Sequence, residues 1–181
     1  LQIRRTDEHG DFIISDCNQI ATRWVDRWLA QHQSGQPEQF RALNIAGPAA
    51  SGKSHLAAVW QSASGAVILH GLDSGFDDHG NDKHFILDEV GSDSPAHGGF
   101  AEEGLFHLFN HVKQVDGSLM ILSPSPVARM IWQLPDLSSR LRTVNLGQIE
   151  EPDDQLLQAL LQRHFAERQL VAPDNVVRYL V

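Results

Sequence analysis

The segment Gly47–Ser54 has the residue types and spacing of a phosphate-binding loop. Its sequence, GPAASGKS, fits the pattern G-x-x-x-x-G-K-[ST]. In such a loop, glycines let successive backbone N–H groups converge on phosphate oxygens, and the N-terminus of the following helix adds a favourable field. Lys53 is then expected to reach the β- and γ-phosphates, and the Ser54 hydroxyl to bind Mg²⁺. The pattern therefore predicts binding of a nucleoside di- or triphosphate.

The elements on either side of this loop provide the context that the chemistry requires. The run Arg41–Ala46 is short and mostly apolar, as a buried parallel strand is, and His55–Gln61 has the pattern of a helix. A chance match of a Gly/Ala-rich turn is the alternative, and the strand–loop–helix order disfavours it. We therefore expect the whole loop to contact the nucleotide, namely Gly47, Pro48, Ala49, Ala50, Ser51, Gly52, Lys53, Ser54 and His55.

A second group of chemically capable residues follows another apolar run. The strand-like segment Lys83–Leu87 ends in Asp88 and Glu89. At the carboxyl end of a core strand, Asp88 is expected to hold the Mg²⁺ hydration shell beside Ser54, and Glu89 to polarise an attacking water. This short pattern is a weak signal alone, but its position after a good phosphate loop makes it strong.

Length and cysteine content restrict the class of protein. A chain of 181 residues suits one α/β domain, or one domain and the start of another. No apolar run approaches the ~20 residues needed to span a bilayer, and no signal-peptide segment follows Arg4 and Arg5. The single cysteine, Cys17, excludes an internal disulfide framework and is expected to be a buried structural thiol. We therefore expect a cytoplasmic protein with no membrane partner.

The net charge of −9 bears on binding to nucleic acid. A domain that binds DNA mainly through phosphates should carry a basic face. The only dense basic cluster is Arg140 with Arg142, and Arg4 with Arg5 is a weaker pair. Strong direct DNA binding by this chain alone is therefore not expected.

Alternating strand and helix patterns predict a parallel α/β sheet flanked by helices, with the nucleotide at its carboxyl edge. Further strands are expected at Ala66–His70, Ser118–Ser123 and Thr143–Leu146, and loops at 71–82 and 91–99. Helices are expected from Asn18, over Phe100–Gln114 and from Pro152. The apolar face of the first is Ile20, Trp24, Val25, Trp28 and Leu29, and that of the last is Leu156, Leu157, Leu160, Leu161 and Phe165.

Another helix begins at Pro173 and stops with the sequence at Val181. We therefore expect residues 1–168 to form the nucleotide-binding domain and residues 169–181 to begin a helical lid that is truncated or absent.

The order of these features resembles the AAA+ ATPases. Within them, Glu102–Asn110 is similar to the helix after the Asp-Glu strand in the DnaA initiator family. The box Leu134–Leu141, LPDLSSRL, resembles that of the Hda-like proteins, DnaA-related regulators that inactivate replication initiation. The segments Pro152–Leu157 and Arg168–Asp174 look like the alphaproteobacterial Hda group. The resemblance covers roughly residues 11–181.

This resemblance implies roles for further residues. Ser123 or Ser125 would occupy the sensor 1 region that reads the γ-phosphate, although Ser125 lies between two prolines. Arg140 would be an arginine finger that projects into the nucleotide of a neighbouring subunit, where a guanidinium on developing phosphoryl charge is worth orders of magnitude in rate. The alternative for Arg140 is a surface ion pair. The residues beside the adenine would be Phe12, Ile13, Ile14 and Asn18.

The function implied is that of an Hda-like regulator. It would hold ADP or ATP with Mg²⁺, associate with the DNA polymerase sliding clamp, and use Arg140 to promote hydrolysis of ATP bound to the DnaA initiator. Its own hydrolysis would be weak, and a homo-oligomer is left open. One departure from the family is Ala50, which replaces a glycine that is common in the phosphate loop.

Three other functions compete with this interpretation. A DnaA-type initiator, or its ATPase fragment, needs a helix-turn-helix domain and basic residues. A small-molecule kinase or other P-loop enzyme leaves the box around Arg140 unexplained. A helicase-loader-like ATPase would bind single-stranded DNA, which the acidic balance of the chain does not favour.

Overall fold

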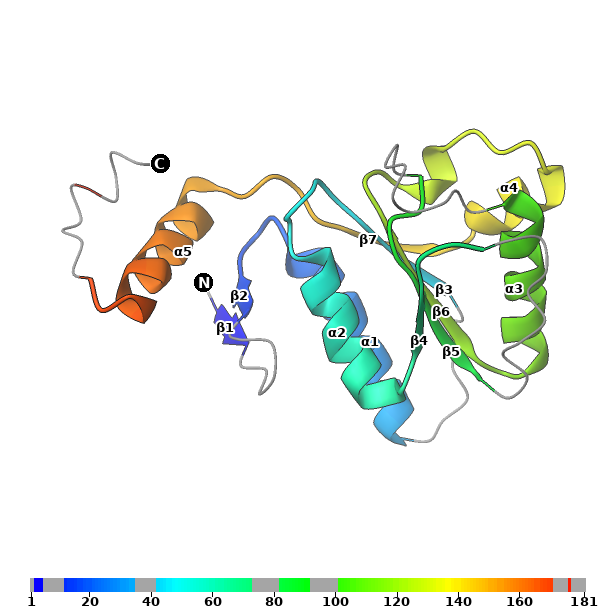
Figure 1. Cartoon of the computed structure of the whole chain (residues 1–181), viewed down its shortest axis with the longest axis horizontal. Helices are drawn as coiled ribbons and strands as arrows, with labels where there is room; N and C mark the ends of the chain where they lie inside the picture. The colour runs from blue at the N-terminus through cyan, green and yellow to red at the C-terminus, as the bar shows by residue number, and fades with distance from the viewer. Residues whose placement is uncertain are drawn as a thin grey trace.

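Strands buried on both faces form the centre of the structure. The computed structural model describes residues 2–4, 12–34, 42–72, 82–91, 101–170 and 176, and the elements given below are those within these ranges. Five strands form a parallel sheet in the order β4-β5-β6-β3-β7 (Figure 1). Their bounds are β3 (Ala42–Ala46), β4 (Val67–Leu69), β5 (His84–Leu87), β6 (Ser118–Ser123) and β7 (Asn145–Gln148). The predicted parallel α/β sheet flanked by helices is confirmed.

Helices cover both faces of this sheet (Figure 1). They are α1 (Gln19–Ser34) and α2 (Lys53–Ser64) on one face, and α3 (Glu102–Gln114) and α4 (Pro135–Leu141) on the other. Along β6, Met120 and Leu122 pack with the α1–α2 layer, whereas Leu119 and Ile121 pack with the α3–α4 layer. This alternation follows from the two-residue period of a strand, and it explains why the core strands are continuous apolar runs in the sequence.

The segment before α1 contains a short strand. Residues Phe12–Ile14 form β2, which pairs antiparallel with β1 (Gln2–Arg4). The Asn18 side chain accepts from Ser15 N at 3.0 Å and donates to Ile13 O at 3.0 Å, so it closes the turn into α1. The predicted burial of Ile20 is wrong, because its side chain is 55% exposed at the start of the helix.

The last strand of the sheet begins two residues later than predicted. Thr143 N donates to Arg140 O at 2.9 Å, and Val144 N donates to Leu141 O at 3.4 Å. These bonds continue the turns of α4, so that extended backbone begins only at Asn145.

The helix α5 (Asp154–Glu167) lies at one end of the molecule, away from α3 and α4 (Figure 1). Its predicted acidic start is confirmed, since the Asp153 carboxylate accepts from Leu156 N at 2.7 Å as an N-cap. Because α5 packs against β2 and not against the central sheet, its predicted apolar face is covered only in part. Leu156 is buried, whereas Leu160 is 39% exposed.

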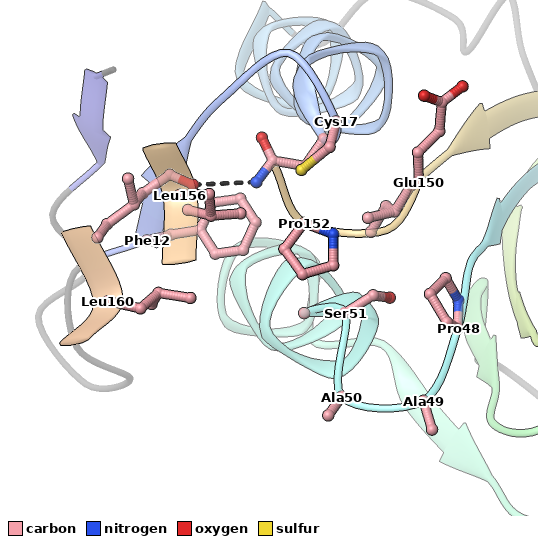
Figure 2. A pocket seen from close by; sticks show the side chains of 14 residues that line it. Phe12, Cys17, Pro48, Ala49, Ala50, Ser51, Glu150, Pro152, Leu156 and Leu160 are labelled. Atoms are coloured by element: carbon pink, nitrogen blue, oxygen red, sulfur yellow. Dashed lines mark hydrogen bonds between the residues drawn. The ribbon is translucent and has the colours of Figure 1, made fainter. Parts of the chain in front are cut away.

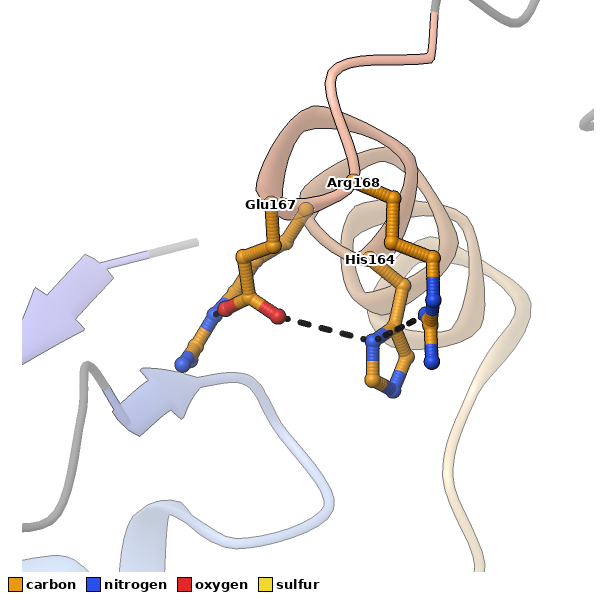
Figure 3. A network of polar contacts seen from close by, with 4 residues as sticks. His164, Glu167 and Arg168 are labelled. Atoms are coloured by element: carbon orange, nitrogen blue, oxygen red, sulfur yellow. Dashed lines mark hydrogen bonds and ion pairs between the residues drawn. The ribbon is translucent and has the colours of Figure 1, made fainter.

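The last turns of α5 carry an exposed polar network (Figure 3). Arg163 Nε donates to Glu167 Oε1 at 2.6 Å, and His164 Nδ1 lies 3.5 Å from Glu167 Oε2. Arg168 Nη1 lies 3.2 Å from His164 Nδ1. Exposed pairs of this kind contribute little to stability.

Some predictions fall outside the described residues. These are most of the two loops predicted at 71–82 and 91–99, and most of the segment 171–181 where a lid is expected to begin. Within the described ranges, no helix is long and apolar enough to cross a membrane.

Candidate functional site

The segment Gly47–Ser54 connects β3 to α2 at the carboxyl edge of the sheet, as predicted. A Cβ atom at Gly47 would lie 2.7 Å from Ile149 O, which is too close for any side chain. Gly52 has φ 96°, and a Cβ atom there would lie 2.8 Å from the Phe12 ring. Both glycines are therefore required by the path of the loop.

The loop leaves hydrogen-bonding groups available to a ligand. No side chain caps the N-terminus of α2, so its first N–H groups can donate to an anion. Among the described residues, the buried Ser51 hydroxyl has no hydrogen-bond partner. A buried donor without a partner costs free energy, and a phosphate oxygen would satisfy it. The loop therefore fits the phosphate group that its sequence predicts.

Ala50 occupies a backbone conformation that favours glycine. Its φ is 58°, in the left-handed region. An L-residue with a Cβ atom pays about 1–2 kcal/mol for this conformation. The departure from the family pattern at this position therefore has a physical cost.

Lys53 lies near both acidic residues of the second motif. Its Nζ donates to Gly47 O at 2.8 Å and to Pro48 O at 2.7 Å. Burial lowers the pKa of Lys53, while the charges of Asp88 and Glu89 raise it. The fold therefore brings the loop lysine and the two carboxylates into one site, as the sequence predicts.

The two acidic residues occupy a turn held at the sheet edge. Asp88 N donates to Leu69 O at 3.0 Å, and Val90 N donates to Leu122 O at 2.9 Å. Glu89 has φ 61°, a left-handed conformation that is uncommon outside glycine. This turn fixes the direction in which both carboxylates leave the end of β5.

The donor set also fits Mg²⁺. Ser54 and Asp88 offer hydroxyl and carboxylate oxygens, which Mg²⁺ prefers. No group of three His, Cys, Asp or Glu side chains in the described part of the chain could hold a metal ion by itself. A Mg²⁺ site usually has one or two protein ligands and is completed by substrate phosphates and water.

An apolar pocket of about 360 Å³ adjoins the loop (Figure 2). Phe12 forms part of its wall and stacks on His55, with ring centroids 4.8 Å apart. Its lining residues are Phe12, Ile13, Cys17, Asn18, Pro48, Ala49, Ala50, Ser51, Gly52, Ile149, Glu150, Pro152, Leu156 and Leu160. The flat base of a nucleotide could occupy this pocket while the phosphates of the nucleotide reach the loop.

Three of the four residues predicted to lie beside the adenine line this pocket. Phe12, Ile13 and Asn18 line it, and Ile14 is not among the lining residues. Sequence reasoning missed the wall from Ile149 to Leu160, which includes the segment after β7. A signal was available only for the residues directly after β7, because a parallel strand beside β3 ends at the same edge of the sheet.

Ser123, one of the two predicted sensor residues, is buried and hydrogen-bonded within the protein. It is fully buried, and its hydroxyl accepts from Asn44 Nδ2 at 2.8 Å and donates to Ser125 O at 2.7 Å. Asn44 also donates to Ile121 O at 2.9 Å and accepts from Val127 N at 3.0 Å. The Ser125 side chain is exposed. A contact between Ser123 and a phosphate would therefore require its present hydrogen bond to be exchanged.

Arg140 does not lie with the phosphate-loop residues but on α4, which is at the opposite end of the molecule from α5 (Figure 1). Its guanidinium donates to Asn110 Oδ1 at 2.7 Å and lies 4.5 Å from the centre of the Phe106 ring. Both partners belong to α3. Within the described residues its contacts are thus an amide and an aromatic ring, and not the carboxylate that a surface ion pair would need.

Sequence reasoning also missed Glu102, which joins α3 to the start of α4. Its two carboxylate oxygens accept from Gln133 N at 2.8 Å and from Leu134 N at 2.7 Å. The helix that carries Arg140 is therefore held by α3 at both of its ends.

No protein-family model and no curated protein matches this sequence. Solved structures do match it. The replication initiator DnaA bound to AMPPCP and single-stranded DNA has a TM-score of 0.70 at 19% identity, over 93% of this chain and 57% of that chain. Domain III of the Thermotoga maritima replication initiation protein DnaA has a TM-score of 0.70 at 15% identity, over 93% and 77% of the two chains. DnaI has a TM-score of 0.56 at 15% identity, over 78% and 86%.

The chain has an AAA+ P-loop fold. The AAA+ likeness rests on the arrangement of strands and helices, since the identities are low. The chain spans only a little over half of the DnaA chain bound to AMPPCP. Within this fold, Lys53 lies near Asp88 and Glu89, and Arg140 lies on α4.

Proposed function

We propose that this chain is an Hda-like regulator of replication initiation, which binds ADP or ATP with Mg²⁺ and promotes hydrolysis of ATP bound to DnaA. The AAA+ fold supports a replication-related P-loop ATPase, since the similar structures include DnaA and DnaI. The resemblance of the LPDLSSRL box to the Hda-like proteins supports the finer assignment.

The nucleotide would be bound by the phosphate loop and the adjoining pocket. The loop N–H groups and Lys53 would hold the phosphates, and the apolar wall around Phe12 would hold the base. Ser54 and Asp88 would hold Mg²⁺, which supplies neutralisation of phosphate charge when bound. That one of the similar DnaA structures contains AMPPCP is consistent with this use of the fold.

The position of Arg140 carries the proposal that it acts in trans. The helix that carries Arg140, α4, lies at the opposite end of the molecule from α5, which contributes Leu156 and Leu160 to the pocket (Figure 1). Arg140 is therefore poorly placed for the nucleotide of its own chain, and well placed to meet another molecule. Its guanidinium would stabilise charge that develops on the phosphoryl group of DnaA-bound ATP. The sliding clamp would bring the regulator to DNA, in the cytoplasm.

The experiment that tests the proposal measures ATP hydrolysis by DnaA in the presence of this chain, the sliding clamp and DNA. Stimulation by wild type that is lost in Arg140→Ala supports it. Arg23→Ala, which changes an exposed arginine on α1, is the matched control and should stimulate like wild type. Absence of stimulation by wild type, or equal stimulation by Arg140→Ala, would remove the assignment.

A self-contained AAA+ ATPase, including a helicase-loader-like one, is the second candidate. The proximity of Glu89 to Lys53 favours it, because a carboxylate beside the phosphates can polarise an attacking water. The two functions differ in one measurement. The second candidate hydrolyses ATP rapidly without DnaA, whereas the regulator turns over slowly on its own.

A further inference from the structure

The loop between the 3-10 turn η1 (Val127–Arg129) and α4 exposes a large apolar side chain. Ile131 is 91% exposed, compared with 55% for Ile20 on α1. A single exposed isoleucine is common on protein surfaces and means little alone. Its surroundings decide whether it has a role.

The residues on both sides of Ile131 are held firmly in place. Met130 covers Gly91, where a Cβ atom would lie 2.7 Å from Met130 Cε. Trp132 Nε1 donates to Val127 O at 2.9 Å. The next two backbone N–H groups, those of residues 133 and 134, donate to the Glu102 carboxylate. A side chain on a loop that is already ordered loses little conformational entropy on binding, as a docking contact requires.

The segment that carries Ile131 has a net charge opposite to that of the whole chain. The segment 124–143 contains three arginines and one aspartate, a net charge of +2, in a chain of net charge −9. Arg129 and Arg142 are exposed. An apolar residue with the exposed Arg129 two positions before it fits a partner that offers an apolar hollow with a carboxylate at its border.

This chain's own pocket shows that its fold builds such a surface. The hollow beside the phosphate loop is lined by Leu156 and Leu160 and by the exposed Glu150. A partner ATPase of the same fold would present the matching surface next to its own nucleotide. The loop that carries Ile131 leads directly into α4, which carries Arg140.

We propose that Ile131 is the apolar anchor with which this chain docks beside the nucleotide pocket of a partner ATPase of the same fold. This inference rests on the proposed function, since it assigns the docking contact of the same interface. Ile131 contributes to the affinity of the complex and Arg140 to the rate of hydrolysis. Substitutions of the two residues should therefore change different quantities.

The test titrates the chain into a fixed amount of ATP-bound DnaA, with clamp and DNA, and follows hydrolysis. Ile131→Ser is expected to raise the half-maximal concentration about tenfold and to leave the plateau unchanged, as loss of an interface anchor does. Arg140→Ala should lower the plateau instead. Ile20→Ser, which removes another exposed isoleucine, should match wild type. An unchanged half-maximal concentration for Ile131→Ser would overturn the inference.

Direct binding separates this inference from the proposed function. The labelled chain is titrated with the AAA+ domain of DnaA and followed by fluorescence anisotropy, with no hydrolysis required. Binding that weakens about tenfold in Ile131→Ser, without any stimulation by wild type, keeps the anchor and removes the regulatory function. No binding by wild type, or self-association that Ile131→Ser abolishes while binding to DnaA is unaffected, overturns the anchor. Because Ile131 is exposed, its variant should unfold at the same temperature as wild type.

Discussion

Lys53 Nζ donates to the carbonyl oxygen of Gly47 at 2.8 Å, which joins the end of the phosphate loop to its beginning. A second bond to Pro48 O at 2.7 Å strengthens this closure. The ammonium is thus held at the centre of the loop, within the field of Asp88 and Glu89. To bind a phosphate, it has only to exchange carbonyl oxygens for phosphate oxygens.

Lys53→Ala should therefore weaken nucleotide binding strongly. We expect the affinity for Mg²⁺–ADP to fall about 100-fold, or ~2.7 kcal/mol, because a charged hydrogen bond to phosphate is lost. Isothermal titration calorimetry measures this directly. Lys113→Ala, on the exposed side of α3, should bind like wild type. Equal affinities for all three proteins would show that the loop does not bind nucleotide phosphates.

Ala50→Gly should stabilise the fold. Left-handed backbone costs an L-residue about 1–2 kcal/mol, and the greater chain entropy of glycine offsets about 0.5–1 kcal/mol of the relief. We expect the free energy of unfolding, measured with urea, to rise by about 0.5–1 kcal/mol. Ala49 is not among the residues with positive φ, so Ala49→Gly should be neutral or destabilising. The same effect at both positions would contradict strain at Ala50.

Asn44→Ala should destabilise the fold more than its size suggests. The substitution leaves the buried Ile121 O, Ser123 Oγ and Val127 N without the partner that Asn44 provides. We expect a loss of about 2–3 kcal/mol in the free energy of unfolding, since unsatisfied buried polar groups are costly. Ser125→Ala, which removes an exposed hydroxyl, should cost about 0.5 kcal/mol or less. A loss below about 1 kcal/mol for Asn44→Ala would argue that water replaces the amide.

The half-buried imidazole of His84 should make stability depend on pH. Burial lowers the pKa of His84, and the nearby His32 and Lys83 lower it further. The unfolded chain, with a His pKa near ~6.5, then binds a proton more readily than the folded chain. The contribution to stability is therefore present above that pH and is lost as pH falls below it.

Thermal unfolding measured between about pH 7.5 and pH 5.5 tests this dependence. We expect the midpoint to fall on acidification, and to fall less in His84→Gln. His107→Gln, an exposed position on α3, should retain the wild-type slope. Parallel pH profiles for wild type and His84→Gln would exclude His84 as the source.

The features that the sequence predicts well are local. The phosphate loop, its strand and its helix are contiguous, and Asp88 follows an apolar strand that must end at the same sheet edge. The strands of the sheet can also be predicted from the sequence, because parallel strands are buried on both faces and so appear as continuous apolar runs.

The features that it misses depend on contacts between distant segments. The pocket wall formed by Pro152 and Leu156 exists because α5 packs against β2. Glu102 binds the backbone at Leu134, and nothing in the local pattern of either residue indicates that bond. Ile20 fits the helical periodicity of its neighbours, but periodicity does not say whether another segment covers the first turn.

The action of Arg140 on DnaA-bound ATP is tested most directly by an assay that detects hydrolysis of that ATP only. DnaA is loaded with γ-labelled ATP and mixed with this chain loaded with unlabelled ADP, together with clamp and DNA, so that release of label reports only DnaA. We expect at least about tenfold faster release with wild type, lost in Arg140→Ala and not restored in Arg140→Lys, because a lysine cannot reproduce the planar guanidinium. Release at the unstimulated rate with wild type, or equal stimulation by Arg140→Ala, would show that Arg140 does not promote hydrolysis of DnaA-bound ATP.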